Sequence, residues 1–144
     1  MAYTHYWHVK WVDILKKKLM LSNLKNVLDD FNDIIQFEND DDNPPLLNEN
    51  QIRFNGKDNE GYETFCFPFK LNDGFCKTGR NPYDTPVCIC LLILKAHFGI
   101  SMSLSSDGFG YKLDDDWTYP ISYVKKLGYD VSFIDSEIEV NIKK

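Results

Sequence analysis

The sequence predicts an α+β fold, with a mainly antiparallel sheet covered by two or three helices in a single two-layer domain. Three observations lead to this class. Short segments rich in aromatic and β-branched residues alternate with turn residues, which is typical of strands. Residues 13–31 carry apolar side chains at helical spacing, and residues 87–94 form an unbroken apolar run. Short strands joined by turns favour antiparallel pairing, and the helices then cover one face of the sheet.

The N-terminal half contains the first strand and an amphipathic helix. Residues 3–9 are rich in aromatic side chains and predict a strand. Residues 13–31 place leucines on one side and lysines and aspartates on the other, so this helix packs one face on something flat. The remaining elements of this half are a short strand at 34–37, a polar acidic loop at 39–50, and strands at 51–55 and 62–69.

The C-terminal half is organised around a buried helix. Residues 87–98 are apolar nearly all round, which predicts cover on more than one side, and Gly99 ends the helix. Asn81 is expected to cap this helix with Pro82 at its first position, and Thr85 offers a later start. A short strand is expected at 75–78, and a second at 100–104 with Ile100, Met102 and Leu104 on one face. A turn follows at 105–108. The last helix is expected to be capped by one of Asp114, Asp115 and Asp116 and to end at Gly128.

Residues 131–134 and 138–142 alternate like strands, although a frayed tail fits them equally well. We therefore expect one domain over residues 1–134, followed by a C-terminal tail or edge strand at 135–144. The length of 144 residues is close to the commonest size of a single domain.

Charge is unevenly distributed along the chain. The formal net charge of −6 argues against a non-specific nucleic-acid binder, which normally presents a basic face. The first 25 residues are nevertheless basic, whereas residues 26–51 contain no lysine or arginine and eight acidic side chains. A solvated helix face followed by a solvated loop accounts for this pattern. A basic helix that contacts a phosphate backbone is the alternative.

The four cysteines are Cys66, Cys76, Cys88 and Cys90. The N-terminus shows no signal-peptide pattern, so we expect a reducing, cytoplasmic location and free thiols. Cys88 and Cys90 do not have the C-x-x-C spacing of a zinc or redox centre, and we expect no metal and no cofactor. The longest apolar run has eight residues, whereas a membrane span needs about 20, so no membrane contact is expected.

The turn that precedes the buried helix is the place where local chemistry suggests a ligand. Lys77 and Arg80 lie beside the predicted helix N-terminus, and Gly79 between them gives the backbone freedom. Free N–H groups and the helix dipole make such a position receptive to anions. The alternative is that Arg80 pairs with a surface acid and that Lys77 is solvated. The glycine patterns of P-loops and Rossmann folds are missing from the sequence.

His5, Ser105, Ser106 and Asp107 are candidate neighbours of this turn. Alternation along the first strand places His5 and Trp7 on one face and His8 on the other, so the two histidines should not share a metal. In a catalytic interpretation His5 is the general base and Asp107 orients it. In a structural interpretation His5 is simply hydrogen-bonded, and residues 105–108 are turn formers.

Six short segments, spread over most of the chain, form a recognisable set. They are Thr4-His5-Tyr6-Trp7, Ile52-Arg53-Phe54-Asn55-Gly56, Glu63-Thr64-Phe65, Phe75-Cys76-Lys77-Thr78, Asn81-Pro82-Tyr83-Asp84 and Ser105-Ser106-Asp107-Gly108. This set resembles one found, in the same order, in small uncharacterised proteins of bacteria, phages and some protists. The long acidic loop and the tail at 132–144 depart from it. The resemblance implies no activity.

Three functional hypotheses follow. The first is a non-enzymatic binding domain that recognises an anionic small molecule or partner group through Lys77, Arg80, His5, Ser105, Ser106 and Asp107. The second is a protein–protein interaction module that uses exposed aromatic residues or the acidic loop. The third is a small hydrolase or transferase with a histidine base, for which His5 must reach Asp107 or a nucleophile.

Overall fold

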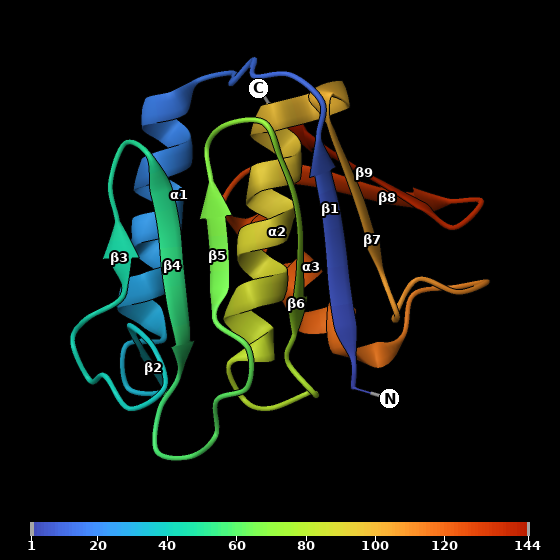
Figure 1. Cartoon of the computed structure of the whole chain (residues 1–144). Coiled ribbons are helices and arrows are strands. Elements are labelled where there is room, and N and C mark those ends of the chain that lie inside the picture. The colour runs from blue at the N-terminus through green and yellow to red at the C-terminus, as the bar shows by residue number, and fades with distance from the viewer. Residues whose placement is uncertain (1, 144) are drawn as a thin grey trace.

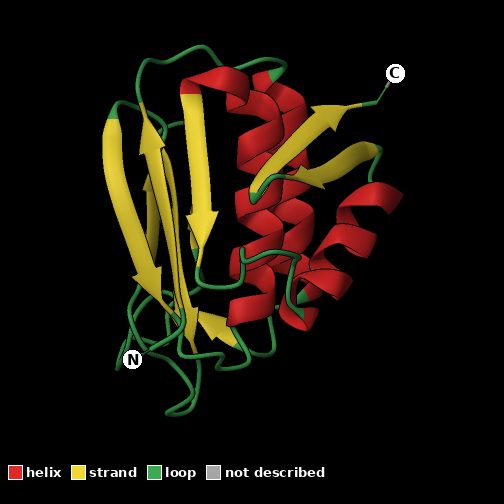
Figure 2. Ribbon diagram, turned by 90° about the vertical axis from the view of Figure 1, so that its right-hand side faces the viewer, coloured by secondary structure: helices red, strands yellow, loops and turns green. Residues whose placement is uncertain are grey.

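The computed structural model describes residues 2–143 and confirms the α+β class, with most strands on one side of the helices and a C-terminal two-stranded hairpin on the other (Figures 1 and 2). The first sheet has the strand order β6-β1-β7, formed by β6 (Asn72–Lys77), β1 (Thr4–Val9) and β7 (Met102–Ser106). Both pairings are antiparallel, and His5 lies opposite Cys76 on one side and Ser106 on the other. The predicted strand at 3–9 is therefore the centre of this sheet.

The second sheet is built around β4 (Gln51–Gly56). It pairs antiparallel with β2 (Ile35–Gln36), β3 (Leu46–Leu47) and β5 (Phe65–Pro68). Phe65, Phe67 and Phe69 share a buried face, as their alternation predicts. The ring of Trp7 on β1 packs against Phe65 and Phe67, so the two sheets meet over one core.

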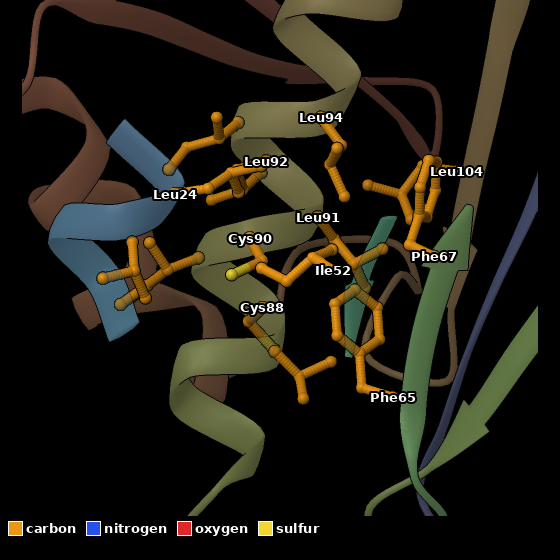
Figure 3. Close-up of a cluster of buried hydrophobic side chains, with 14 of the residues drawn as sticks. Leu24, Ile52, Phe65, Phe67, Cys88, Cys90, Leu91, Leu92, Leu94 and Leu104 are labelled. Carbon is orange, nitrogen blue, oxygen red and sulfur yellow. The ribbon is translucent and has the colours of Figure 1, made fainter. Parts of the chain in front are cut away.

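Helix α2 (Asp84–Phe98) runs through this core (Figure 3). Leu91 and Leu92 have no exposed area although they point to different sides, because sheets, helices and the C-terminal hairpin surround the helix. The stretch Asp84–Ser101 is long and apolar enough to cross a membrane by length and composition alone. Since 78% of it is buried inside the domain, a core helix accounts for its composition equally well.

The other helices and the C-terminal hairpin cover the remaining sides of α2. Helix α1 (Lys17–Asp30) and helix α3 (Thr118–Lys126) both pack on it. Asp114 caps the short 3₁₀ turn η2 (Asp115–Trp117) that leads into α3, since its side chain accepts from the Asp116 N–H. Strands β8 (Tyr129–Ile134) and β9 (Glu137–Ile142) form a hairpin, and β9 places Ile138 and Val140 against the core.

Two expectations about helix starts are wrong. Helix α1 begins at Lys17 and not at residue 13, because Lys16 adopts a left-handed backbone and Leu15 is hydrogen-bonded to His97. Helix α2 begins at Asp84, and neither Asn81 nor Thr85 caps it. The Asn81 amide instead donates to the carbonyl of Gly61.

Two further expectations, one about the acidic loop and one about Ile100, are also wrong. The loop at 39–50 contains strand β3, because Leu46 and Leu47 pair with β4. Ile100 does not share the buried face of Met102 and Leu104. It lies in the 3₁₀ turn η1 (Gly99–Ser101), where its side chain is 81% exposed.

Candidate functional site

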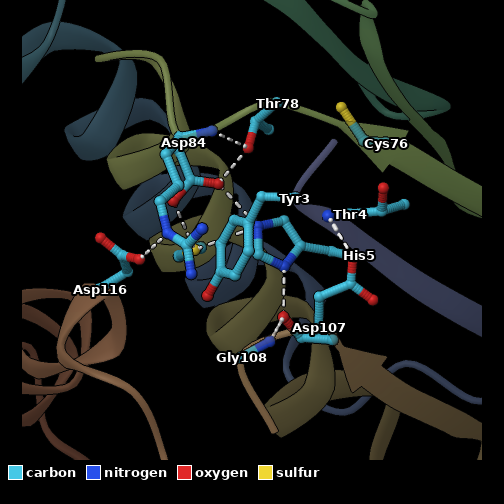
Figure 4. A network of polar contacts seen from close by, with 12 residues as sticks. Tyr3, Thr4, His5, Cys76, Thr78, Asp84, Asp107, Gly108 and Asp116 are labelled. Carbon is cyan, nitrogen blue, oxygen red and sulfur yellow. Dashed lines mark hydrogen bonds and ion pairs between the residues drawn. The ribbon is translucent and has the colours of Figure 1, made fainter. Parts of the chain in front are cut away.

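A buried polar cluster joins strand β1 to the first turn of α2 (Figure 4). His5 has no exposed area, and both of its ring nitrogens are engaged. Its Nδ1 lies 2.8 Å from Ser106 Oγ, and its Nε2 lies 2.7 Å from Asp84 Oδ1. His5 points inward because inward and outward side chains alternate along β1. Ser106 lies opposite His5 in the β1–β7 register, which is why the two side chains meet.

Helix α2 contributes two side chains to this cluster. Asp84 and Cys88 are four residues apart and therefore project from one face of the helix. The Cys88 sulfur lies 3.5 Å from His5 Nε2 and 3.6 Å from Asp84 Oδ2. Thr78 donates to Asp84 Oδ1 at 2.5 Å. The carboxylate thus uses one oxygen for Thr78 and His5 and turns the other toward the thiol.

Tyr3 and Arg80 cover the cluster on its outer side. The Arg80 guanidinium lies 4.0 Å from the centre of the Tyr3 ring. It also bonds to Asp116 at 2.6 Å and to Asp114 at 3.3 Å. The Tyr3 hydroxyl donates to the same Asp114 carboxylate. A substrate could reach His5 from this side only after these groups moved.

The predicted anion turn has a different environment from the one expected. The N–H groups of Thr78 and Gly79 both donate to the carbonyl of Tyr3, at 3.0 and 3.2 Å. Arg80 has a positive φ of 61° and is already held by two carboxylates. The Lys77 side chain points to solvent, while its N–H donates to Glu63. The turn therefore has little free donor capacity for an added anion.

The other candidate neighbours are divided between two faces. Ser106 belongs to the buried cluster, whereas Ser105 is exposed and lies opposite Tyr6. The proposal that Asp107 orients His5 is wrong, because the Asp107 carboxylate accepts from the Thr4 N–H at 3.0 Å and both His5 nitrogens have other partners. Asp84 takes the orienting position instead.

Burial keeps the cluster's hydroxyl and thiol groups neutral. It raises the pKa of Cys88 well above the usual value for a thiol, and the nearby Asp84 carboxylate raises it further. Burial is also the main cause of the raised pKa of Tyr3, to which Cys88 and Asp114 add. In this state the thiol is not an activated nucleophile, since nucleophilic attack requires the thiolate.

The arrangement nevertheless contains recognisable chemistry. The hydrogen bonds join Ser106 to His5 and His5 to Asp84. Hydrolases join a nucleophile, a base and the residue that orients the base in the same order. The cluster also contains a possible set of metal ligands. It offers one ligand atom from each of His5, Asp84 and Cys88, and these three atoms lie within 4.8 Å of one another. Such a donor set can hold a metal ion. The full burial of His5 favours the second use over catalysis on a substrate.

Sequence reasoning missed Asp84, Cys88 and Thr78 as members of this cluster. Two signals could have found them: the four-residue spacing of Asp84 and Cys88, and the strand face that His5 shares with Trp7. The distance of 79 residues between His5 and Asp84 hid the connection.

A second region stands out at the end of the domain where β1 ends and α1 begins, at the top of Figure 1. We call it the cationic end. Its exposed apolar side chains lie among lysines. It comprises Trp11, Val12, Leu15, Leu19, Leu71 and Ile100 together with Lys10, Lys16, Lys17, Lys18 and Lys70.

Backbone contacts bring these segments together. The Lys10 N–H donates to Ser101 at 2.8 Å, and the Leu15 N–H donates to His97 at 2.9 Å, so the β1–α1 connection lies on the C-terminal end of α2. Val9 pairs with Asn72 on one side and with Met102 on the other, which places Leu71 and Ile100 beside the residues that follow it. The Lys17 ammonium lies 5.9 Å from the centre of the Phe69 ring.

Comparisons of the chain with protein-family models, with curated proteins and with solved structures find no match.

Proposed function

We propose that this domain is a non-enzymatic binding module that attaches to an anionic lipid surface through its cationic end. The observation that carries the proposal is the coincidence of an exposed tryptophan with aliphatic side chains and lysines on a chain of net charge −6. Tryptophan favours the boundary between water and lipid, and lysines beside it attract anionic headgroups.

The apolar members of the cationic end support contact with a bilayer. Trp11 is 46% exposed and Leu15 59% exposed, and both lie in the connection between β1 and α1. Ile100 and Leu71 flank them from neighbouring turns. Side chains at a domain tip can enter the headgroup region without rearrangement of the core.

The charges support the same partner. The segment from Lys10 to Leu19 contains four lysines and one aspartate, whereas the chain as a whole is acidic. Lysines near an anionic membrane contribute about 1 kcal/mol each. The anionic membrane surface attracts these lysines and repels the acidic remainder of the molecule. The domain would therefore approach the membrane with the cationic end first.

The sequence led us to expect no membrane contact because no apolar run is long enough to span a bilayer. A surface contact requires no spanning segment. A cytoplasmic location also remains part of the proposal, since all four cysteines are free and the cytoplasmic leaflet carries the anionic lipids.

Tryptophan fluorescence tests this proposal directly. Trp7 and Trp117 are buried at 4% and 0% exposure, so Trp11 is the tryptophan that responds to the surface. Vesicles of phosphatidylcholine mixed with phosphatidylserine should shift the emission to the blue, and the shift should weaken with salt. Phosphatidylcholine vesicles alone should cause little change.

Three results would overturn the proposal. The first is no shift with anionic vesicles at low salt. The second is equal affinity for duplex DNA, which would indicate a general polyanion site. The third is a concentration-dependent dimer that Trp11→Ser abolishes, which would assign the cationic end to a second copy of the chain.

A further inference from the structure

We propose that His5, Asp84 and Cys88 bind a divalent transition-metal ion, with zinc as the best fit. The three side chains offer one nitrogen, one oxygen and one sulfur within 4.8 Å of one another. Zinc is bound by these donor types in proteins. This inference is independent of the lipid contact, because the cluster and the cationic end share no residue.

The two separations measured from the Cys88 sulfur suit a tetrahedral ion. Bond lengths of about 2.3 Å to sulfur and about 2.0–2.1 Å to nitrogen or oxygen place sulfur about 3.5 Å from each of the other donors. The Cys88 sulfur lies 3.5 Å from His5 Nε2 and 3.6 Å from Asp84 Oδ2. Asp84 would bind through Oδ2, since Oδ1 is the partner of Thr78.

A surrounding set of hydrogen bonds holds the donors in place. His5 Nδ1 contacts Ser106 Oγ, which also accepts from the Gly108 N–H at 3.0 Å. A metal-bound histidine normally donates its second ring N–H to such an oxygen, and ligating carboxylates are themselves hydrogen-bonded. Ser106 and Thr78 are in position for these two roles.

Charge gives a separate reason for an ion. The Asp84 side chain is 7% exposed, and its partners in the described chain are Thr78, His5 and Cys88, with no lysine or arginine among them. The hydrogen bonds of Asp84 offset the cost of burying its carboxylate, and a divalent ion would add the full counter-charge that no lysine or arginine among its partners supplies. A divalent ion with one thiolate and one carboxylate is neutral.

The binding step balances as follows. We take as the starting state the His5 tautomer in which Nε2–H donates to Asp84 and Nδ1 accepts from the Ser106 hydroxyl, with Cys88 as a thiol. On binding, the imidazole changes tautomer, so that Nδ1–H donates to Ser106 and the Nε2 lone pair faces the ion. Cys88 loses its proton to solvent. One proton is released for each ion bound, which makes the affinity rise with pH.

A pair of cysteine variants provides the test. Cys88 and Cys90 both lie on α2 with no exposed area, but only Cys88 belongs to the cluster. The full chain is unfolded with chelator, refolded with zinc and dialysed, and its metal content is measured by elemental analysis. Wild type and Cys90→Ser should retain about one zinc per chain, whereas Cys88→Ser should retain none while its circular dichroism remains that of the wild type.

Cobalt provides a second readout. The cobalt-loaded wild type should show a thiolate-to-cobalt absorption band that Cys88→Ser lacks and Cys90→Ser keeps. Wild type that retains no zinc after refolding, or Cys88→Ser that retains as much as wild type, would overturn the inference. If both variants fail to fold, the zinc content of the wild type decides.

Discussion

The buried position of Asp84 leads to the most specific prediction about stability. Replacing it with alanine leaves His5 Nε2 and Thr78 Oγ1 without their partner, since Asp84 Oδ1 accepts from both at 2.7 and 2.5 Å. Each unsatisfied buried group costs about 1–3 kcal/mol. In the metal-free protein the expected loss is therefore about 2–6 kcal/mol of a total that is typically about 5–15 kcal/mol.

Urea unfolding in the presence of a chelator measures this loss. With a slope of about 2 kcal/mol per molar, the midpoint should fall by about 1–3 M. Asp29→Ala is the matched control, because Asp29 pairs with Lys25 on the exposed face of α1, and such a pair contributes about 0.3–0.5 kcal/mol. The midpoint shift of Asp84→Asn should lie between those of Asp84→Ala and Asp29→Ala, since the amide oxygen of the new side chain still accepts from Thr78. An Asp84→Ala midpoint shift no larger than that of Asp29→Ala would refute the account of the cluster.

Further predictions concern the core, one histidine and the thiols. Leu91→Ala should cost about 2–5 kcal/mol because Leu91 has no exposed area, and an unchanged urea midpoint would contradict its place in the core. Burial lowers the pKa of His97, so the stability due to its neutral form is complete above the unfolded pKa of about 6.5 and is lost as the pH falls toward the folded pKa. The stability advantage of wild type over His97→Gln should therefore shrink between pH 8 and 5, and an advantage that grows would contradict this sign. Thiol titration with chelator should count four groups in the denatured chain and only Cys66 in the native one. The reason is that the other three cysteines have no exposed area. Rapid reaction of a second native thiol would be inconsistent with that burial.

Local patterns in the sequence were sufficient for most of the fold. The all-round apolar character of residues 87–98 identified the core helix, and alternation identified β1 and placed His5 on the same face as Trp7. The start of α1 was not predictable in this way. The contact that keeps α1 from starting before Lys17 comes from His97, which is 82 residues from Leu15 in the chain. Helical spacing alone cannot reveal such a tertiary contact.

The two functional regions differ in how far the sequence revealed them. The lysines of the cationic end were visible as a charge asymmetry, but the strand register was needed to place Leu71 and Ile100 beside them. The cluster was hidden more completely, because each of its histidine contacts spans at least 79 residues. In the catalytic interpretation Asp107 was the partner of His5, but the register of β1 with β7 brings Ser106 to the imidazole instead.

Vesicle flotation with a lysine variant measures how much the cationic end contributes to lipid binding. In Lys16→Gln/Lys17→Gln/Lys18→Gln, three charges of about 1 kcal/mol each are removed from the cationic end, so partitioning onto phosphatidylserine-containing vesicles should fall about 100-fold. The control is Lys125→Gln/Lys126→Gln, which removes two exposed lysines from α3. Our account predicts that the control floats with the vesicles like the wild type and that the triple variant stays in solution. Equal flotation of the two variants, or none by the wild type, would contradict it.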